Sequence, residues 1–368
     1  MKKQYFFGLP ALLALLSSCA QTSSFPLEDY VREVQSDSSS LQILQLTDIH
    51  WNMTTEVEKA TAYLDNTIKV AKEKAGGKID LIAITGDSLL VATKALASKV
   101  YDVIDSWGIP FFVTYGNHDL QGLWSASWMN ENVSSPKRQN SLFVDLKDDI
   151  HGESNYVINW KKGGKTIWQI YSIDTGHYRA ENAVQYNYDY IHEDQIEWFE
   201  KEADLAKGEE TDYLPSLVFG HIGLPEITEV ANIYENELKR ADEMGDPSLS
   251  KMDGENAYIG GYYHENNSPS HVKTRFFESA KSHGVRGMFF GHDHSDDAVF
   301  KYQDVVLGFG VKANTELYYT DGAIGEEEIT VTGGALYTLK EEGTFDIEHI
   351  YIDYNNPSNV KGWKKEAL

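Results

Sequence analysis

Side chains that bind metal ions recur in five short segments of this sequence. Each segment contains aspartate, asparagine or histidine, and in four of the five a glycine stands directly before the polar residues. Glycine permits tight turns and a close approach of the backbone. Imidazole and carboxylate groups suit zinc, manganese and iron, and the lack of thiolates in these segments argues against a soft-metal site. The segments are Asp48-Ile49-His50, Gly86-Asp87, Gly116-Asn117-His118-Asp119, Gly220-His221 and Gly291-His292-Asp293-His294.

Each segment follows a run of residues that predicts a β-strand. Helical spacing is predicted at residues 57–74 and 94–107, and hairpin-like antiparallel runs begin near residue 328. Strands separated by helices indicate a largely parallel sheet, and the carboxyl ends of such strands form one crevice. The sequence therefore predicts a mixed α/β domain that brings all five segments to one rim. Strands are predicted at residues 41–46, 79–84, 110–115, 167–173, 217–219, 287–290 and 305–309.

The five segments, in this order, resemble the motif series of the calcineurin-like metallophosphoesterase superfamily, which runs D-x-H, G-D, G-N-H-[DE], a lone H and G-H-x-H. The resemblance covers residues 48–294 and implies a four-layer α/β/β/α sandwich with mixed sheets. Residues 172–176, 195–198 and 221–226 resemble the purple-acid-phosphatase-like branch, which includes a yeast cell-cycle phosphatase. The sequence departs from true purple enzymes, because Leu90 stands at the position of their iron-binding tyrosine and His50 is present. This departure argues against a purple iron–tyrosinate centre.

The resemblance also implies two divalent or trivalent metal ions, of manganese, zinc or iron, with Asp87 bridging them. His118 would be the general acid for the leaving oxygen, and Asp119 would orient it. Lys312 is a candidate to pair with a substrate phosphate, with a plain loop lysine as the alternative. The implied ligands are Asp48, His50, Asp87 and His294 for one ion, and Asp87, Asn117, His221 and His292 for the other.

Two such ions can clamp the attacking and leaving oxygens of a phosphoryl transfer and supply hydroxide at neutral pH. The expected function is therefore hydrolysis of a small phosphate ester, with a phosphomonoester favoured over a phosphodiester. The 32 basic and 57 acidic residues give a formal charge of −25, which disfavours a nuclease and nucleic-acid partners. The alternative from another class is a catalytically inactive, surface-anchored binding module that retains the fold.

The first nineteen residues have the pattern of an export signal. Lys2 and Lys3 precede an apolar run at residues 6–16, which is too short to span a bilayer as a helix. The run ends in Leu16-Ser17-Ser18-Cys19, which resembles a bacterial lipobox, and Cys19 is the single cysteine of the chain. We therefore expect Cys19 to carry lipid and to anchor an extracytoplasmic protein to the cell membrane. An ordinary cleaved signal is the alternative.

The remaining chain divides into three expected parts, the second of which contains an insertion. Residues 20–40 are serine-rich and predict a tether, and residues 41–353 form the phosphoesterase domain. Within it, the polar, glycine-containing stretch 226–270 predicts a lid or specificity insertion, and residues 354–368 are a tail. Among the aromatic residues, Trp51 and Tyr178 are candidates for the pocket mouth, against core packing as the alternative. His151, His192 and His349 are expected to be ordinary surface or core groups.

Overall fold

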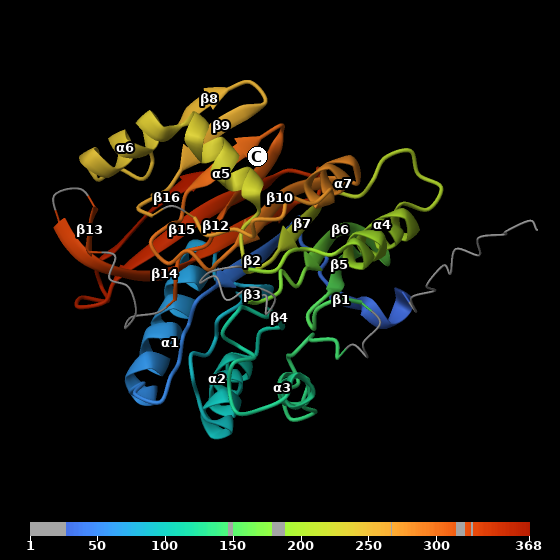
Figure 1. The fold of residues 1–368 in the computed structure, drawn as a ribbon, viewed down its shortest axis with the longest axis horizontal. Helices are drawn as coiled ribbons and strands as arrows, with labels where there is room; N and C mark the ends of the chain where they lie inside the picture. The colour runs from blue at the N-terminus through green and yellow to red at the C-terminus, as the bar shows by residue number, and fades with distance from the viewer. Residues whose placement is uncertain (1–26, 146–149, 179–187, 266, 314–320, 325–326) are drawn as a thin grey trace, which may run out of the picture.

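The strands of the protein form two mixed sheets that pack face to face, shown in Figure 1 as a computed structural model. Aromatic side chains fill the space between the sheets: the rings of Phe112 and Phe219 lie 5.6 Å apart, and those of Phe289 and Tyr337 lie 4.4 Å apart. Such side chains dominate the energetics of burial in a core. The structure describes residues 27–145, 150–178, 188–265, 267–313, 321–324 and 327–368.

The smaller sheet carries the first three site segments. Its strands lie in the order β16-β15-β14-β2-β3-β4, with β13 paired to β14. The pairs β2–β3 and β3–β4 are parallel, whereas β14 joins β2 and β15 in antiparallel pairs, as the hairpin pattern predicted. The strands are β2 (Ser40–Leu46), β3 (Leu81–Thr85), β4 (Phe111–Thr114), β13 (Asp321–Ile324), β14 (Glu327–Lys340), β15 (Phe345–Asp353) and β16 (Val360–Lys365).

The larger sheet carries the last two site segments. Its strands lie in the order β1-β5-β6-β7-β10-β12-β11-β9-β8, and its centre, from β6 to β12, is parallel. The strands are β1 (Val31–Gln35), β5 (Tyr156–Lys162), β6 (Lys165–Ser172), β7 (Ser216–Phe219), β8 (Lys251–Asp253), β9 (Asn256–Gly260), β10 (Val285–Phe290), β11 (Val299–Tyr302) and β12 (Val305–Phe309).

Helices cover the outer faces of the two sheets, so the fold has the predicted four layers (Figure 1). Helix α1 shows why: it buries Leu64, Ile68 and Ala71, which share one face at helical spacing. Helices α1, α2 and α3 lie beside the smaller sheet, and α4, α5 and α7 lie beside the larger one. The helices are α1 (Val57–Lys74), α2 (Lys94–Ser106), α3 (Ala126–Val133), α4 (Glu193–Lys207), α5 (Pro225–Ile233), α6 (Glu235–Met244) and α7 (Phe276–Ser282).

The domain extends beyond both boundaries that the sequence predicted. Residues 27–40 of the expected tether contain a short 3-10 helix (Leu27–Tyr30) and strand β1, which pairs in parallel with β5. Tyr30 is buried, with its ring 5.8 Å from that of Trp198. The expected tail contains β16, which pairs with β15 and buries Trp363. The tether and tail predictions are therefore wrong for these residues.

The targeting segment lies outside the described residues. Cys19, the expected signal at 1–19 and the first part of the tether fall within the undescribed residues 1–26. In the part of the chain that the structure does describe, no helix is both long and apolar enough to span a membrane.

Residues 226–270, predicted to be a lid or specificity loop, form regular structure at the edge of the larger sheet. They fold as most of α5, then α6 and the β8–β9 hairpin, and β9 pairs with β11. The end of the segment reaches the metal-binding side of the sheet, because the backbone N–H of Ser268 donates to Asp293 Oδ1 (3.0 Å). The segment therefore extends the sheet, and whether it selects substrates stays a prediction.

Candidate metal centre

The structure brings all seven predicted ligands together at the carboxyl ends of parallel strands. Asp48 and His50 follow β2, and Asp87 and Asn117 follow β3 and β4 of the same sheet. The other three ligands come from the facing sheet. Because both sheets present this end at the same side, segments from opposite layers meet there. The ligands from the larger sheet are His221 after β7, and His292 and His294 after β10.

Four of these residues form a group whose ligand atoms converge, namely Asp48, His50, Asp87 and His294. The Nε2 atoms of His50 and His294 lie only 3.0 Å apart, and His294 Nε2 is 3.2 Å from Asp48 Oδ1. Asp87 Oδ2 lies 3.6 Å from His50 Nε2. Two imidazole nitrogens cannot both act as acceptors toward each other, so a cation between them is the arrangement that uses both lone pairs.

A second group shares Asp87 with the first. Asp87, His221 and His292 have ligand atoms close enough to hold one ion. His221 Nε2 lies 3.2 Å from Asp87 Oδ2 and 3.2 Å from the amide Oδ1 of Asn117. Because Asp87 belongs to both groups, its carboxylate is placed to bridge two ions.

Hydrogen bonds from the backbone fix the orientation of these ligands. The carbonyl oxygen of Thr85 accepts from His221 Nδ1 (2.8 Å), which leaves Nε2 to face Asp87. Asp48 Oδ2 accepts from the backbone N–H of His292 (3.0 Å), and Asp87 Oδ1 accepts from that of His118 (2.8 Å). Asp87 Oδ2 is buried with no hydrogen-bond partner. Outer partners of this kind are what orient metal ligands, and an orphaned carboxylate oxygen in such a place fits a metal ion.

The backbone is strained where it presents the ligands. Asp48, His50, Asp87 and His292 all have positive φ, between 49° and 77°. Such conformations cost on the order of 1–3 kcal/mol each in a non-glycine residue and persist when the surroundings impose them, as functional sites do. Close packing also explains why a glycine precedes Asn117. A Cβ at Gly116 would lie 2.2 Å from Asp87 Oδ1, which is too close for any other residue.

The charges of the centre also fit metal ions. Burial alone would raise the pKa of Asp48, yet His294 and the other histidines around it hold that pKa well below its usual range. Burial lowers the pKa of His221, but Asp87 outweighs burial and raises it to about 10. Burial lowers the pKa of His292 to about 3, with His221 adding to the effect. The carboxylate of Asp48 is thus held ionised, as a metal ligand must be, and an ion bound at His221 would replace the proton that Asp87 stabilises on that imidazole.

His118 lies at the edge of this centre, where solvent can reach it. Its side chain is 23% exposed, and its Nε2 lies 4.0 Å from Asp87 Oδ2. Its Nδ1 pairs with Gln121 Oε1 at 2.7 Å. Gln121 is the orienting residue that the sequence reasoning missed, and its spacing three residues after His118 was the available signal.

Asp119 does not orient His118, which corrects the prediction. Its carboxylate is buried and accepts hydrogen bonds from the backbone N–H groups of Gly116 (2.8 Å) and Leu89 (3.3 Å). Burial, with a smaller effect of Asp87, raises the pKa of Asp119 to about 7. Asp119 therefore stabilises the turn that carries Asn117 and His118.

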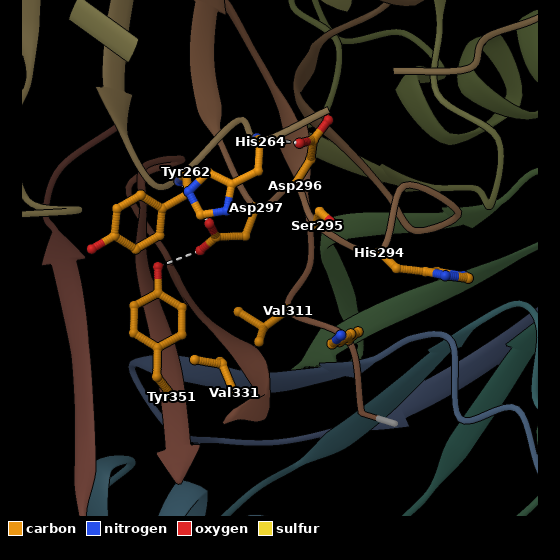
Figure 2. A pocket seen from close by; sticks show the side chains of 10 residues that line it. Tyr262, His264, His294, Ser295, Asp296, Asp297, Val311, Val331 and Tyr351 are labelled. Carbon is orange, nitrogen blue, oxygen red and sulfur yellow. Dashed lines mark hydrogen bonds between the residues drawn. The ribbon is translucent and has the colours of Figure 1, made fainter. Parts of the chain in front are cut away.

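Lys312 is buried and lines a pocket of about 400 Å³ together with His294. Figure 2 shows the apolar side of this pocket, formed by Val311, Val331 and the ring of Tyr351, and the imidazole of His294 points away from them. The hydroxyl of Tyr351 donates to Asp297. Lys312 is therefore no exposed loop lysine, and its pairing with a substrate phosphate stays a prediction.

The structure also places the aromatic and histidine residues whose roles the sequence analysis left undecided. Trp51 is buried and so is not at the pocket mouth, whereas Tyr178 is exposed. His349 is a core group, as expected, with its Nδ1 2.8 Å from Asp297 Oδ2. His151 and His192 share the carboxylate of Asp189 and form a separate cluster.

A family model agrees with this geometry. The model described as Calcineurin-like phosphoesterase matches residues 41–296, a range that contains every ligand named above.

Two similar plant proteins cover most of this chain. The chain is 24% identical to the "Probable inactive purple acid phosphatase 29" of Arabidopsis thaliana, over 93% of each chain. It is also 24% identical to the "Probable inactive purple acid phosphatase 14" of the same plant, over 88% of this chain and 82% of the relative. The yeast Saccharomyces cerevisiae protein "Phosphatase DCR2" is 25% identical, over 52% of this chain and 36% of its own length.

Solved structures share the fold at low sequence identity. A dimetal phosphatase from Danio rerio has a TM-score of 0.52 at 12% identity, and the match covers 89% of this chain and 99% of that structure. The Plasmodium protein GAP50, described as the anchor in the inner membrane complex, has a TM-score of 0.52 at 14% identity over 90% of each chain. These likenesses support the two-sheet architecture.

Proposed function

Since the chain belongs to the calcineurin-like phosphoesterase family, we propose that it hydrolyses small phosphate esters and prefers phosphomonoesters to phosphodiesters. The observation that carries the proposal is the complete ligand set, assembled in two groups that share Asp87. Seven residues from two facing sheets converge there, with four of them on strained backbone. Such strain is retained when the site it builds has a function.

Each group at the site would have its own role in the hydrolysis. The two ions, when bound, would supply a water of lowered pKa and stabilise the charge that develops on the phosphoryl oxygens. His118, exposed at the edge and held by Gln121, would donate a proton to the leaving oxygen. Lys312 would add a positive charge on the side of His294.

The second candidate is an inactive binding module that retains the fold. The printed names of the two plant relatives, which call them probably inactive, favour it, and so does the anchoring role in the description of the Plasmodium protein. The yeast relative is named a phosphatase, which favours hydrolysis. In this chain the predicted ligands and His118 are all present, and their side chains lie close to one another. We therefore favour the enzyme.

A panel of substrates and metals tests the proposal. Protein stripped by a chelator is assayed on alkyl and aryl phosphomonoesters and on a phosphodiester, with Mn²⁺, Zn²⁺, Fe²⁺, Mg²⁺ or no metal restored. We expect hydrolysis that depends on added metal and is faster on the monoesters. Two bound ions with no hydrolysis of any ester would favour the binding module instead.

We also propose that lipid on Cys19 anchors the protein outside the cytoplasm. The support is the lipobox-like run ending at Cys19. Mass spectrometry of the mature N-terminus should find a modified Cys19, and Cys19→Ala should release the protein from membranes. An unmodified N-terminus beyond Cys19 would contradict the anchor.

A further inference from the structure

Two tyrosines from the segment that follows β6 face the ligands of the second ion. Tyr178 and Tyr188 pair through an isolated antiparallel bridge, and their rings lie 5.1 Å apart. Tyr188 is 5% exposed, and its ring meets His292 edge to face at 4.5 Å. Tyr178 is 37% exposed. One ring thus packs against the centre while the other stays open to a substrate.

The hydroxyl of Tyr178 lies between a metal ligand and the proposed acid. Asn117 Nδ2 is 3.5 Å from this oxygen, and the ring of Tyr178 lies 6.3 Å from that of His118, edge to face. Because Asn117 directs its Oδ1 toward His221, its NH₂ group is the part that faces Tyr178. The tyrosine oxygen can then accept from Asn117 and from the neighbouring hydroxyl of Tyr188, and its own O–H hydrogen can donate to a further group.

The backbone on both sides of this pair is held in place. The N–H of Asp189 donates to the carbonyl of His177 (2.8 Å), and the hydroxyl of Ser270 donates to the carbonyl of Tyr188 (3.2 Å). The carboxylate of Asp189 is bound in turn by His151 and His192. Tyr178 therefore has an exposed side chain on a backbone that hydrogen bonds already hold in place. Substrate binding then loses less conformational entropy than it would on a flexible backbone.

We propose that Tyr178 binds substrate, and that its hydroxyl donates a hydrogen bond to a phosphoryl oxygen at the face of the second ion. The inference rests on the proposed function for its substrate class, a phosphate ester. A donor aimed at a phosphate oxygen is charge-assisted and binds the ester and the phosphate product alike. Tyr178 is thus distinct from His118, which acts on the leaving oxygen.

The test removes this hydroxyl alone with Tyr178→Phe. A matched control is Tyr190→Phe, which deletes a hydroxyl from a tyrosine whose ring stacks on His192 at 4.2 Å. Inorganic phosphate is titrated into Mn²⁺-loaded protein by calorimetry, and kcat/KM is measured on an alkyl and an aryl phosphate. We expect Tyr178→Phe to weaken phosphate binding and to lower kcat/KM on both substrates by roughly 10-fold, with unchanged metal content. The control should change neither quantity by more than about twofold.

Two results would overturn the role of Tyr178. Unchanged phosphate affinity in Tyr178→Phe would show that the hydroxyl does not touch the phosphoryl group. A loss confined to the alkyl phosphate would show that Tyr178 acts through His118 on the leaving oxygen. The proposed function fails separately, if the wild-type protein hydrolyses no ester. In that case the phosphate titration still decides whether Tyr178 binds the anion, and wild-type protein that binds no phosphate contradicts both.

Discussion

Two clusters of histidine and aspartate in this molecule look alike by distance alone. In the metal centre, His294 Nε2 lies 3.2 Å from Asp48 Oδ1. The second, which we call the surface cluster, consists of His151, His192 and Asp189. In it, His151 Nε2 and His192 Nε2 lie 3.1 Å and 3.0 Å from the two oxygens of Asp189. Both sets therefore offer ligand atoms at the spacing that one ion requires.

The directions of the rings separate the two clusters. In the metal centre the rings of His50 and His294 are steeply inclined, at 82°, and their Nε2 atoms (3.0 Å) are closer than their centroids (4.7 Å). Their lone pairs therefore converge. The rings of His151 and His192 stack at 3.5 Å with an angle of 20°, and each nitrogen meets its own oxygen of Asp189. Near-parallel rings do not aim at one point, so hydrogen bonds account for this cluster.

Burial and backbone strain separate the clusters further. Asp48, His50 and Asp87 are buried and have positive φ, whereas the side chain of His151 is 43% exposed. Converging lone pairs on strained, buried backbone therefore distinguish the candidate metal centre from a cluster of the same ligand types at the same spacing. The surface cluster fixes the base of the Tyr178 segment instead.

The largest expected effect comes from Asp87→Ala in the metal centre. This change removes the shared ligand of both groups, so both ions and hydrolysis should be lost together. The rate should fall roughly 10³-fold or more, since several kcal/mol of transition-state stabilisation depend on the ions. Elemental analysis and the rate on an aryl phosphate measure the two losses. An active Asp87→Ala protein with two bound ions would refute the bridging role.

The next effect separates acid catalysis from metal binding in the same centre. His118→Asn should slow hydrolysis of an alkyl phosphate by ~10²–10⁴-fold, because a poor leaving group needs a proton. A nitrophenyl phosphate needs it far less and should lose much less rate. Metal content should stay at the wild-type value. Single-turnover rates are the proper readout, because product release can limit the aryl substrate. Equal losses on both esters would assign His118 to the phosphoryl group.

The smallest effect tests the surface cluster through stability and pH. Burial raises the pKa of Asp189, but the hydrogen bonds from His192 and His151 outweigh it and hold this pKa below its usual value. A carboxyl whose pKa is depressed by folding stabilises the protein above its unfolded pKa, near ~3.9, and loses this contribution as pH falls through the folded pKa.

Asp189→Asn should therefore lower the free energy of unfolding at pH 7 by about 0.5–1 kcal/mol, since the cluster is partly exposed. Urea unfolding at pH 7 and at pH 3 measures the difference, which should shrink in acid. A difference that stays constant between these pH values would mean that the ionised carboxylate contributes nothing.

The sequence predicted which residues meet at the candidate metal centre, because its signals are local and ordered. Each ligand segment directly follows a strand, so parallel pairing brings Asp48 and Asp87 together in the smaller sheet, and His221 reaches them from the facing sheet. The partner of His118 was not predictable in the same way, because burial decides between Asp119 and Gln121 and adjacency in sequence does not. Strand β1 was missed because it pairs with β5, about 125 residues away, so that no local pattern marks its partner.

The number of metal ions bound per chain separates the metal centre from the surface cluster of His151, His192 and Asp189. Stripped wild-type protein, Asp87→Ala and Asp189→Ala would be reconstituted with Mn²⁺, dialysed and measured by elemental analysis. We expect two ions in the wild type, two in Asp189→Ala and none in Asp87→Ala. A third ion in the wild type that Asp189→Ala loses, or a full pair retained by Asp87→Ala, would contradict the distinction between the two clusters.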